Sequence, residues 1–224
     1  MSEKVVDELI LFRSKNKNED FTLIARDCVG GILYHQLGLK FLTPTINLFF
    51  TPDDFNYFCL YLKDYIEGTL KEDFNSGVNY PVGILTPSES SKIDKEIKIG
   101  FMHYDSYKEA EEKWNERKKR INYDNLYVVN TFCYPVEIAS LNDELIKNWN
   151  KIKYPKIVIT DKKYGFKNEF IIDKPQECEE YAWLLFAPDK SNPWKRTFNE
   201  FDFIKFLNRN SFLRRIKRFF KKNK

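Results

Sequence analysis

The segment that most constrains the fold is residues 21–39, FTLIARDCVGGILYHQLGL. It begins with a short apolar run ending at Ile24, which predicts a buried strand. The polar pair Arg26 and Asp27 breaks that run, and the residues after it have the apolar spacing of a helix that ends at Gly38. Cys28 therefore stands where a strand passes into a helix. Because the free amides of a first helical turn favour negative charge, we expect a lowered pKa for the Cys28 thiol.

Two glycines, Gly30 and Gly31, follow this cysteine. Glycine has no Cβ, so a ligand or another backbone segment can approach it closely. We therefore predict that both glycines contribute to a substrate-binding surface. The pair alone does not make a phosphate site, and the chain has no Walker or dinucleotide-binding glycine loop.

The rest of the chain alternates β-branched or aromatic runs with segments of helical periodicity. Strands are expected at residues 80–85, 97–101, 126–132, 156–160, 170–172 and 182–186, and helices at residues 5–12, 51–66, 106–120, 141–152 and 198–207. This alternation predicts an α/β fold with a mixed β-sheet flanked by helices. We expect residues 1–210 to form a single domain.

Composition restricts the classes of protein and of site. With 42% hydrophobic and 31% charged residues the chain is globular, and no apolar run is long enough to cross a membrane. The N-terminus carries acids where a signal peptide has basic residues, so we expect a cytoplasmic location. Four widely spaced cysteines without a CxxC pair, and only two histidines, predict neither a metal site nor a disulfide framework. No cofactor is expected.

The positive charge is concentrated at the C-terminus. Residues 214–224 hold seven Lys or Arg and no acid, so the net charge of +4 becomes −3 without them. A mildly acidic body argues against nucleic acid as a partner. Residues 211–224, SFLRRIKRFFKKNK, have aromatic and aliphatic residues at helical spacing among the basic ones. This pattern predicts a basic amphipathic helix that binds an anionic membrane surface, or an ordinary helix that packs on the body.

Cys28 with His103 is the candidate catalytic pair. His103 follows the strand predicted at residues 97–101 and is the histidine best placed to serve as a base for a thiol. Asp105 is the first candidate to orient the imidazole, and Asp124 or Asn130 is an alternative. The competing interpretation is a small buried cysteine and a structural histidine. His35 and Cys59 lie inside helical patterns, and we expect both to be structural.

A row of larger side chains is predicted on the helix at residues 106–120. Trp114, Arg117 and Arg120 are three residues apart and share roughly one side. Such a row could bind a phosphate or carboxylate group, because arginine donates forked hydrogen bonds. The alternative is a solvated helix face on which the arginines pair with neighbouring glutamates.

Several blocks of the sequence together resemble a known family. The blocks are DCVGGILYHQLGL, PTINLFF, TPDDFNYF, YPVGIL, IKIGFMHYDS and EAEEKWNERKKRINYDNLYVV. In this order they resemble the bacterial family called domain of unknown function 1919, from about residue 21 to at least residue 208. Its members often have Asn-Asn-Cys-Trp-Gly-Gly where this chain has RDCVGG, so the cysteine and glycines match and the Asn and Trp do not. The order of strand, cysteine and helix also resembles, more distantly, putative papain-like cysteine peptidases.

The resemblance implies a biosynthetic pathway, because members of the family are often labelled exopolysaccharide biosynthesis proteins. We therefore expect an enzyme of capsule or exopolysaccharide assembly at the inner face of the plasma membrane, acting on an activated or lipid-linked sugar. Cys28 and His103 would carry acyl transfer or hydrolysis. The alternatives are a glycosyl- or phospho-sugar transferase without a covalent step, and a non-catalytic assembly factor associated with the membrane.

Overall fold

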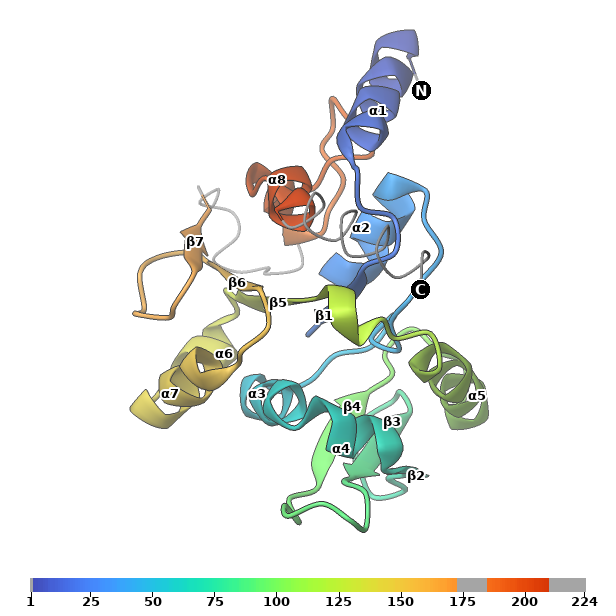
Figure 1. Cartoon of the computed structure of the whole chain (residues 1–224), viewed down its shortest axis with the longest axis vertical. Helices are drawn as coiled ribbons and strands as arrows, with labels where there is room; N and C mark the ends of the chain where they lie inside the picture. Colours follow the sequence, from blue (N-terminus) through green and yellow to red (C-terminus); the bar gives the residue numbers. More distant parts are fainter. Residues whose placement is uncertain (1, 173–184, 210–224) are drawn as a thin grey trace, which may run out of the picture.

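The computed structural model describes residues 2–172 and 185–209 of the chain (Figure 1). The proposed tail at residues 211–224, Cys178 and most of the strand expected at residues 182–186 lie outside the described residues. The predicted α/β class is confirmed, with parallel and antiparallel strands arranged as two sheets flanked by helices.

The central sheet is parallel. Its strands, in spatial order, are β1 (Thr22–Ala25), β5 (Leu126–Phe132), β6 (Lys156–Thr160) and β7 (Glu169–Ile171). Every residue of β1, β5 and β6 is buried, as expected for parallel strands covered on both faces. The registers pair Ala25 with Val129 and Thr131 with Ile159, so the carboxyl ends of these strands meet at one edge.

The second sheet is a small antiparallel meander. It consists of β2 (Thr69–Glu72), β3 (Val82–Thr86) and β4 (Ile97–Gly100). The segment at residues 48–50 joins it to the central sheet, because the Phe49 N–H donates to the Gly100 carbonyl at 2.8 Å and the Phe50 N–H donates to the Arg26 carbonyl at 3.1 Å. Residues that follow β1 and residues that follow β4 are thereby held side by side.

Helices cover both faces of the central sheet (Figure 1). Buried residues of α2 (Val29–Leu37) and α8 (Phe203–Asn208) share one apolar cluster, near α1 (Glu3–Lys15). On the other face a second cluster contains residues of α3 (Pro52–Leu60), α4 (Leu62–Glu67), α5 (Tyr107–Lys118) and α7 (Asp143–Lys151) together with both sheets. The two sheets therefore share a core.

Four local predictions differ from the structure. The helix expected over residues 198–207 is a 3₁₀ turn at Thr197–Glu200 followed by α8. The helix expected over residues 51–66 is interrupted at Tyr61 and forms α3 and α4. Strand β2 was not expected, because its sequence TLKE is half polar and only Leu70 is buried. The short helix α6 (Pro135–Ala139) was also missed, because five residues are too few to show a helical period.

Candidate active site

The candidate site lies in the crevice between the carboxyl ends of β1 and β5. The chain leaves β1 through α2, on one face of the sheet, and leaves β5 through α6 and α7, on the other face. Open α/β sheets bind ligands at the point where neighbouring connections diverge in this way. Residues that follow the two strands line this crevice: Arg26, Asp27 and Cys28 after β1, and Tyr134, Val136 and Glu137 after β5.

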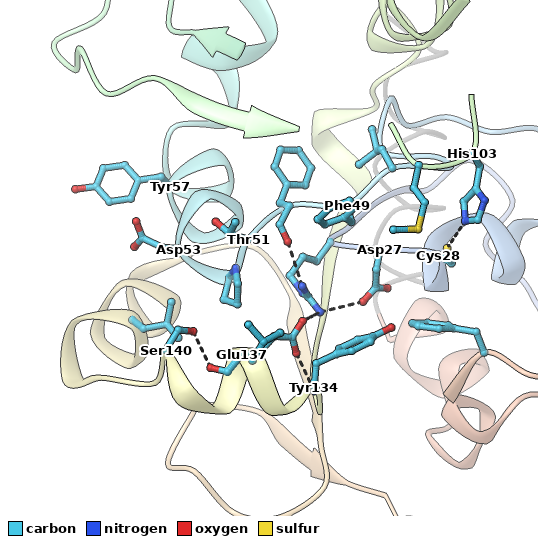
Figure 2. Close-up of a pocket in the computed structure, with 18 of the residues that line it drawn as sticks. Asp27, Cys28, Phe49, Thr51, Asp53, Tyr57, His103, Tyr134, Glu137 and Ser140 are labelled. Atoms are coloured by element: carbon cyan, nitrogen blue, oxygen red, sulfur yellow. Dashed lines mark hydrogen bonds and ion pairs between the residues drawn. The ribbon is translucent and has the colours of Figure 1, made fainter. Parts of the chain in front are cut away.

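Cys28 and His103 face one another at one end of the crevice (Figure 2). The Cys28 Sγ lies 3.5 Å from the His103 Nε2, which is within hydrogen-bonding distance for sulfur. The contact depends on the segment at residues 48–50, which ties the end of β1 to the end of β4 by backbone hydrogen bonds. The predicted proximity of the two side chains is thus found, and their chemical roles are taken up below.

The ionisation of Cys28 differs from the expectation. Cys28 is the N-cap residue of α2, yet burial, with a contribution from the negative charge of Asp27, raises the pKa of its thiol to about 11. Both effects disfavour the thiolate. The lowered pKa expected from the position at a helix start is therefore wrong, and at neutral pH Cys28 is a thiol.

None of the three candidates for orienting His103 forms a hydrogen bond with it in the described part of the chain. Asp105 is exposed, it does not line the crevice, and no hydrogen bond between Asp105 and His103 occurs among the described residues. Asp124 precedes β5 at its amino end, away from the site. Asn130 is buried within β5, and its Oδ1 has no hydrogen-bond partner in the described part of the chain. The expectation that Asp105 orients the imidazole is not supported.

The floor of the crevice is a buried ionic network that the sequence interpretation treated only as a polar break. The Arg26 guanidinium forms ion pairs with the carboxylates of Asp27 and Glu137, and the exposed fractions of these three side chains are 4%, 9% and 7%. Arg26 also donates to the carbonyls of Thr131 and Phe50 at 3.1 Å. Burial raises the pKa of Glu137, whereas the positive charge of Arg26 acts in the opposite direction.

The two carboxylates of this network also fix the backbone around the site. Asp27 accepts a hydrogen bond from the Val29 N–H at 3.1 Å and another from the Thr131 hydroxyl. Glu137 accepts from the N–H groups of Cys133 and Tyr134 at 3.2 and 3.1 Å. Asp27 thus holds the start of α2 next to Cys28, and Glu137 holds the turn that follows β5.

The crevice opens into a cavity of about 1140 Å³. Figure 2 shows Cys28 and His103 at one end and Thr51, Asp53 and Tyr57, from the first turns of α3, at the other. Met102 and Val136 also line the cavity, and because they are 51% and 76% exposed they form its rim. A ligand in the cavity would therefore extend from the thiol towards α3.

The predicted phosphate-binding row lies elsewhere. Trp114 is 1% exposed and belongs to the core, so its ring is not available to a ligand. Arg117 donates to the Tyr104 hydroxyl at 2.6 Å, and Arg120 donates to the Phe41 carbonyl at 3.2 Å and pairs with Glu116. None of the three residues lines the cavity. The interpretation of this row as a substrate site is replaced by packing and internal hydrogen bonding.

The two glycines also have structural roles. Gly30 and Gly31 are buried within α2 and do not line the cavity. A Cβ at Gly30 would lie 2.8 Å from the Cβ of Ala25, so this glycine allows α2 to pack closely on β1. The close approach inferred from the sequence is therefore found, with β1 rather than a ligand as the neighbour.

The remaining cysteine and histidine assignments agree with the sequence. Cys59 is 1% exposed on α3, and burial raises the pKa of its thiol well above the usual value. His35 is exposed on α2, packs edge-on against Phe41, and does not line the cavity.

Within residues 2–172 and 185–209, no three His, Cys, Asp or Glu side chains are grouped so as to hold a metal, and none of the helices is long and apolar enough to span a membrane.

Comparison with known proteins agrees with the resemblance seen in the sequence blocks. An uncharacterised protein of Haemophilus influenzae is 29% identical over 196 residues, which cover 87% of each chain. The family model described as "Domain of unknown function (DUF1919)" matches residues 3–208, nearly the whole described chain. The chain therefore belongs to the DUF1919 family.

Proposed function

We propose that this protein is a hydrolase or acyltransferase that forms a covalent acyl intermediate on Cys28. The observation that carries the proposal is the 3.5 Å separation of the Cys28 Sγ and the His103 Nε2 at one end of a large cavity. A thiol within hydrogen-bonding reach of an imidazole is the arrangement that nucleophilic catalysis requires.

The raised pKa of Cys28 decides how the reaction would begin. With a thiol pKa of about 11, a stable thiolate–imidazolium pair is not the resting state. His103 would instead accept the Sγ proton on Nε2 as the sulfur attacks the carbonyl carbon of an ester or thioester, acting as a general base. For Nε2 to be the acceptor, the ring proton of the neutral imidazole must be on Nδ1.

Departure of the leaving group and resolution of the acyl-enzyme use the same two groups, Cys28 and His103. The C–O or C–S bond of the donor breaks, and the leaving group takes the proton from His103. Water, or an acceptor hydroxyl, then gives its proton to His103 and attacks the thioester carbonyl. The C–S bond to Cys28 breaks, and His103 returns the proton to the sulfur, which restores the thiol.

The charges of the cavity favour this reaction over the transfer of a phosphorylated sugar. The acidic groups that line the cavity outnumber the basic ones: Asp27, Asp53, Glu137 and Glu144 against Arg26 and Lys95. Arg26 and Lys95 are both paired with carboxylates, and Arg117 and Arg120 lie outside the cavity. A diphosphate group would find no unpaired arginine or lysine among these residues, whereas an uncharged carbonyl compound would meet no electrostatic barrier.

The biological setting proposed here comes from the sequence resemblance. We propose capsule or exopolysaccharide assembly, in which the hydroxyl of an activated or lipid-linked sugar would be the acceptor that resolves the acyl-enzyme. The diphosphate of such an acceptor would have to remain outside the acidic cavity. The basic tail at residues 211–224 would bring the protein to an anionic membrane surface.

The test is hydrolysis of p-nitrophenyl butyrate and of a butyryl thioester by the full chain, the Cys28→Ala variant and the His103→Ala variant. We expect both variants to lose about 10²- to 10⁴-fold in kcat/KM. The matched control is His35→Ala, since His35 is the other histidine and lies outside the cavity; its kcat/KM should stay near that of the unaltered chain. Mass spectrometry after rapid quenching should find the butyryl group on Cys28. Equal rates for His103→Ala and His35→Ala would overturn the proposal.

A further inference from the structure

The polar groups on the floor of the cavity are already satisfied within the protein. The nitrogen atoms of Arg26 donate to Thr131, Phe50, Asp27 and Glu137. Both carboxylate oxygens of Asp27 and both of Glu137 also have partners. A ligand lying over this floor would gain few new hydrogen bonds, because the groups that could provide them are engaged.

The surface that remains available beside the thiol is mainly hydrocarbon. Side chains from four separate segments line it: Leu48, Phe49 and Phe50 after α2, Met102 beside His103, Val136 on α6, and Phe186. Two of them, Met102 and Val136, are more than half exposed. Exposed apolar side chains that line one cavity are typical of a site that binds an apolar group.

The size of the cavity indicates a long ligand. Pockets for small ligands are roughly 300–1,000 Å³, and this cavity measures about 1140 Å³. It extends from Cys28 to Asp53 and Tyr57 at the start of α3 (Figure 2), so a group bonded to the sulfur has a continuous path away from it. Polar and charged side chains, including Thr51, Asp53 and Ser140, lie towards the far end (Figure 2).

We propose that the cavity binds a long, uncharged acyl chain, and that the acyl group transferred to Cys28 is of medium or long chain length. This inference rests on the proposed function, because the thiol defines the end of the cavity where the carbonyl carbon would lie. The excess of carboxylates over basic groups favours an ester or thioester and disfavours a free fatty acid, whose carboxylate would be repelled.

The first experiment measures kcat/KM for p-nitrophenyl acetate, butyrate, octanoate and decanoate, each below its critical micelle concentration. Each methylene group that leaves water for an apolar site adds up to about fourfold in binding. We expect kcat/KM of the full chain to rise at least about tenfold from butyrate to octanoate. Activity that depends on Cys28 but is equal for all chain lengths, or highest for acetate, would overturn the inference and leave the proposed function standing.

A pair of exposed valines provides a matched test of the path. Val136→Asp places a charge at the rim of the cavity, and Val78→Asp places the same charge at an exposed site that does not line it. We expect Val136→Asp to lower the ratio of kcat/KM for octanoate to kcat/KM for acetate at least about tenfold, and Val78→Asp to leave this ratio unchanged. Equal effects of the two substitutions on octanoate would contradict the assigned path.

A binding measurement separates the two proposals if no turnover is seen. The Cys28→Ala variant is titrated calorimetrically with 1-decanol and with decanoate, which share a chain length and differ in charge. We expect 1-decanol to bind at least about tenfold more tightly than decanoate. Tighter binding of decanoate would overturn the inference, and so would no binding of either. Tight binding of decanol with no Cys28-dependent hydrolysis of any ester would overturn the covalent function alone.

Discussion

The Glu137 carboxylate pairs with the Arg26 guanidinium beneath the cavity, where the two side chains are only 7% and 4% exposed. A buried ion pair does not by itself add stability, but removing one partner leaves the other charge without compensation. Arg26 would then face only the carboxylate of Asp27, which is bound to other groups as well.

We therefore predict that Glu137→Gln lowers the free energy of unfolding by about 3 kcal/mol, measured by urea denaturation. The control is Glu116→Gln. Glu116 pairs with Arg120 but its side chain is 55% exposed, so its loss should cost less than about 1 kcal/mol. Similar costs for the two variants would show that the buried pair is not a structural support of the site.

The reactivity of Cys28 towards iodoacetamide should follow the raised pKa of its thiol. A pKa of about 11 lies above the usual thiol value, so the thiolate fraction, and with it the alkylation rate, should rise about tenfold per pH unit from pH 7 to 10. Free cysteine is the reference, and its rate should level off above pH 9. Cys59, at 1% exposed, should stay unlabelled in the native protein. A plateau for Cys28 below pH 9 would contradict the assigned pKa.

The charge of Asp27 should hold back that reactivity. Asp27 disfavours the Cys28 thiolate, so Asp27→Asn should lower the pKa of the thiol and speed alkylation at pH 8 by about 3- to 10-fold. Asparagine keeps an oxygen that can accept the Val29 N–H, so the start of α2 should be preserved. Asp53→Asn is the control, because Asp53 lines the far end of the same cavity. An equal gain for both variants would mean that the effect is not local.

The sequence predicted those parts of the fold that depend on local patterns. Strands β5 and β6 were predicted at their observed bounds, because a strand that is buried along its whole length has a continuous β-branched and aromatic run in the sequence. The proximity of Cys28 and His103 was predicted because each follows a strand. The Arg26–Glu137 pair was not, since the two residues are more than a hundred positions apart and nothing local marks either side chain as buried. The pKa of Cys28 was misjudged because it is raised mainly by burial, and that burial comes from segments distant in the sequence.

The tail remains a prediction from the sequence alone. If residues 211–224 bind membranes, the full chain should co-sediment with anionic liposomes at low salt, and a chain ending at Asn210 should not. Added salt should release the full chain, because part of the attraction is between exposed charges. If both chains stay in the supernatant, the membrane interpretation of the tail is wrong.

The two glycines of α2 should respond differently to the same substitution. A Cβ at Gly30 would lie 2.8 Å from the Ala25 Cβ, whereas the nearest atom to a Cβ at Gly31 is 3.7 Å away. Gly30→Ala should therefore lower the free energy of unfolding by about 1–3 kcal/mol through overpacking.

Gly31→Ala, in contrast, should be neutral or stabilising by up to about 1 kcal/mol, because alanine favours a helix. Thermal and urea unfolding of the two variants measure the difference. Neither glycine lines the cavity, so Gly31→Ala should also keep the esterase activity of the full chain. A stable Gly31→Ala variant with much reduced activity would return this glycine to the substrate-binding role inferred from the sequence.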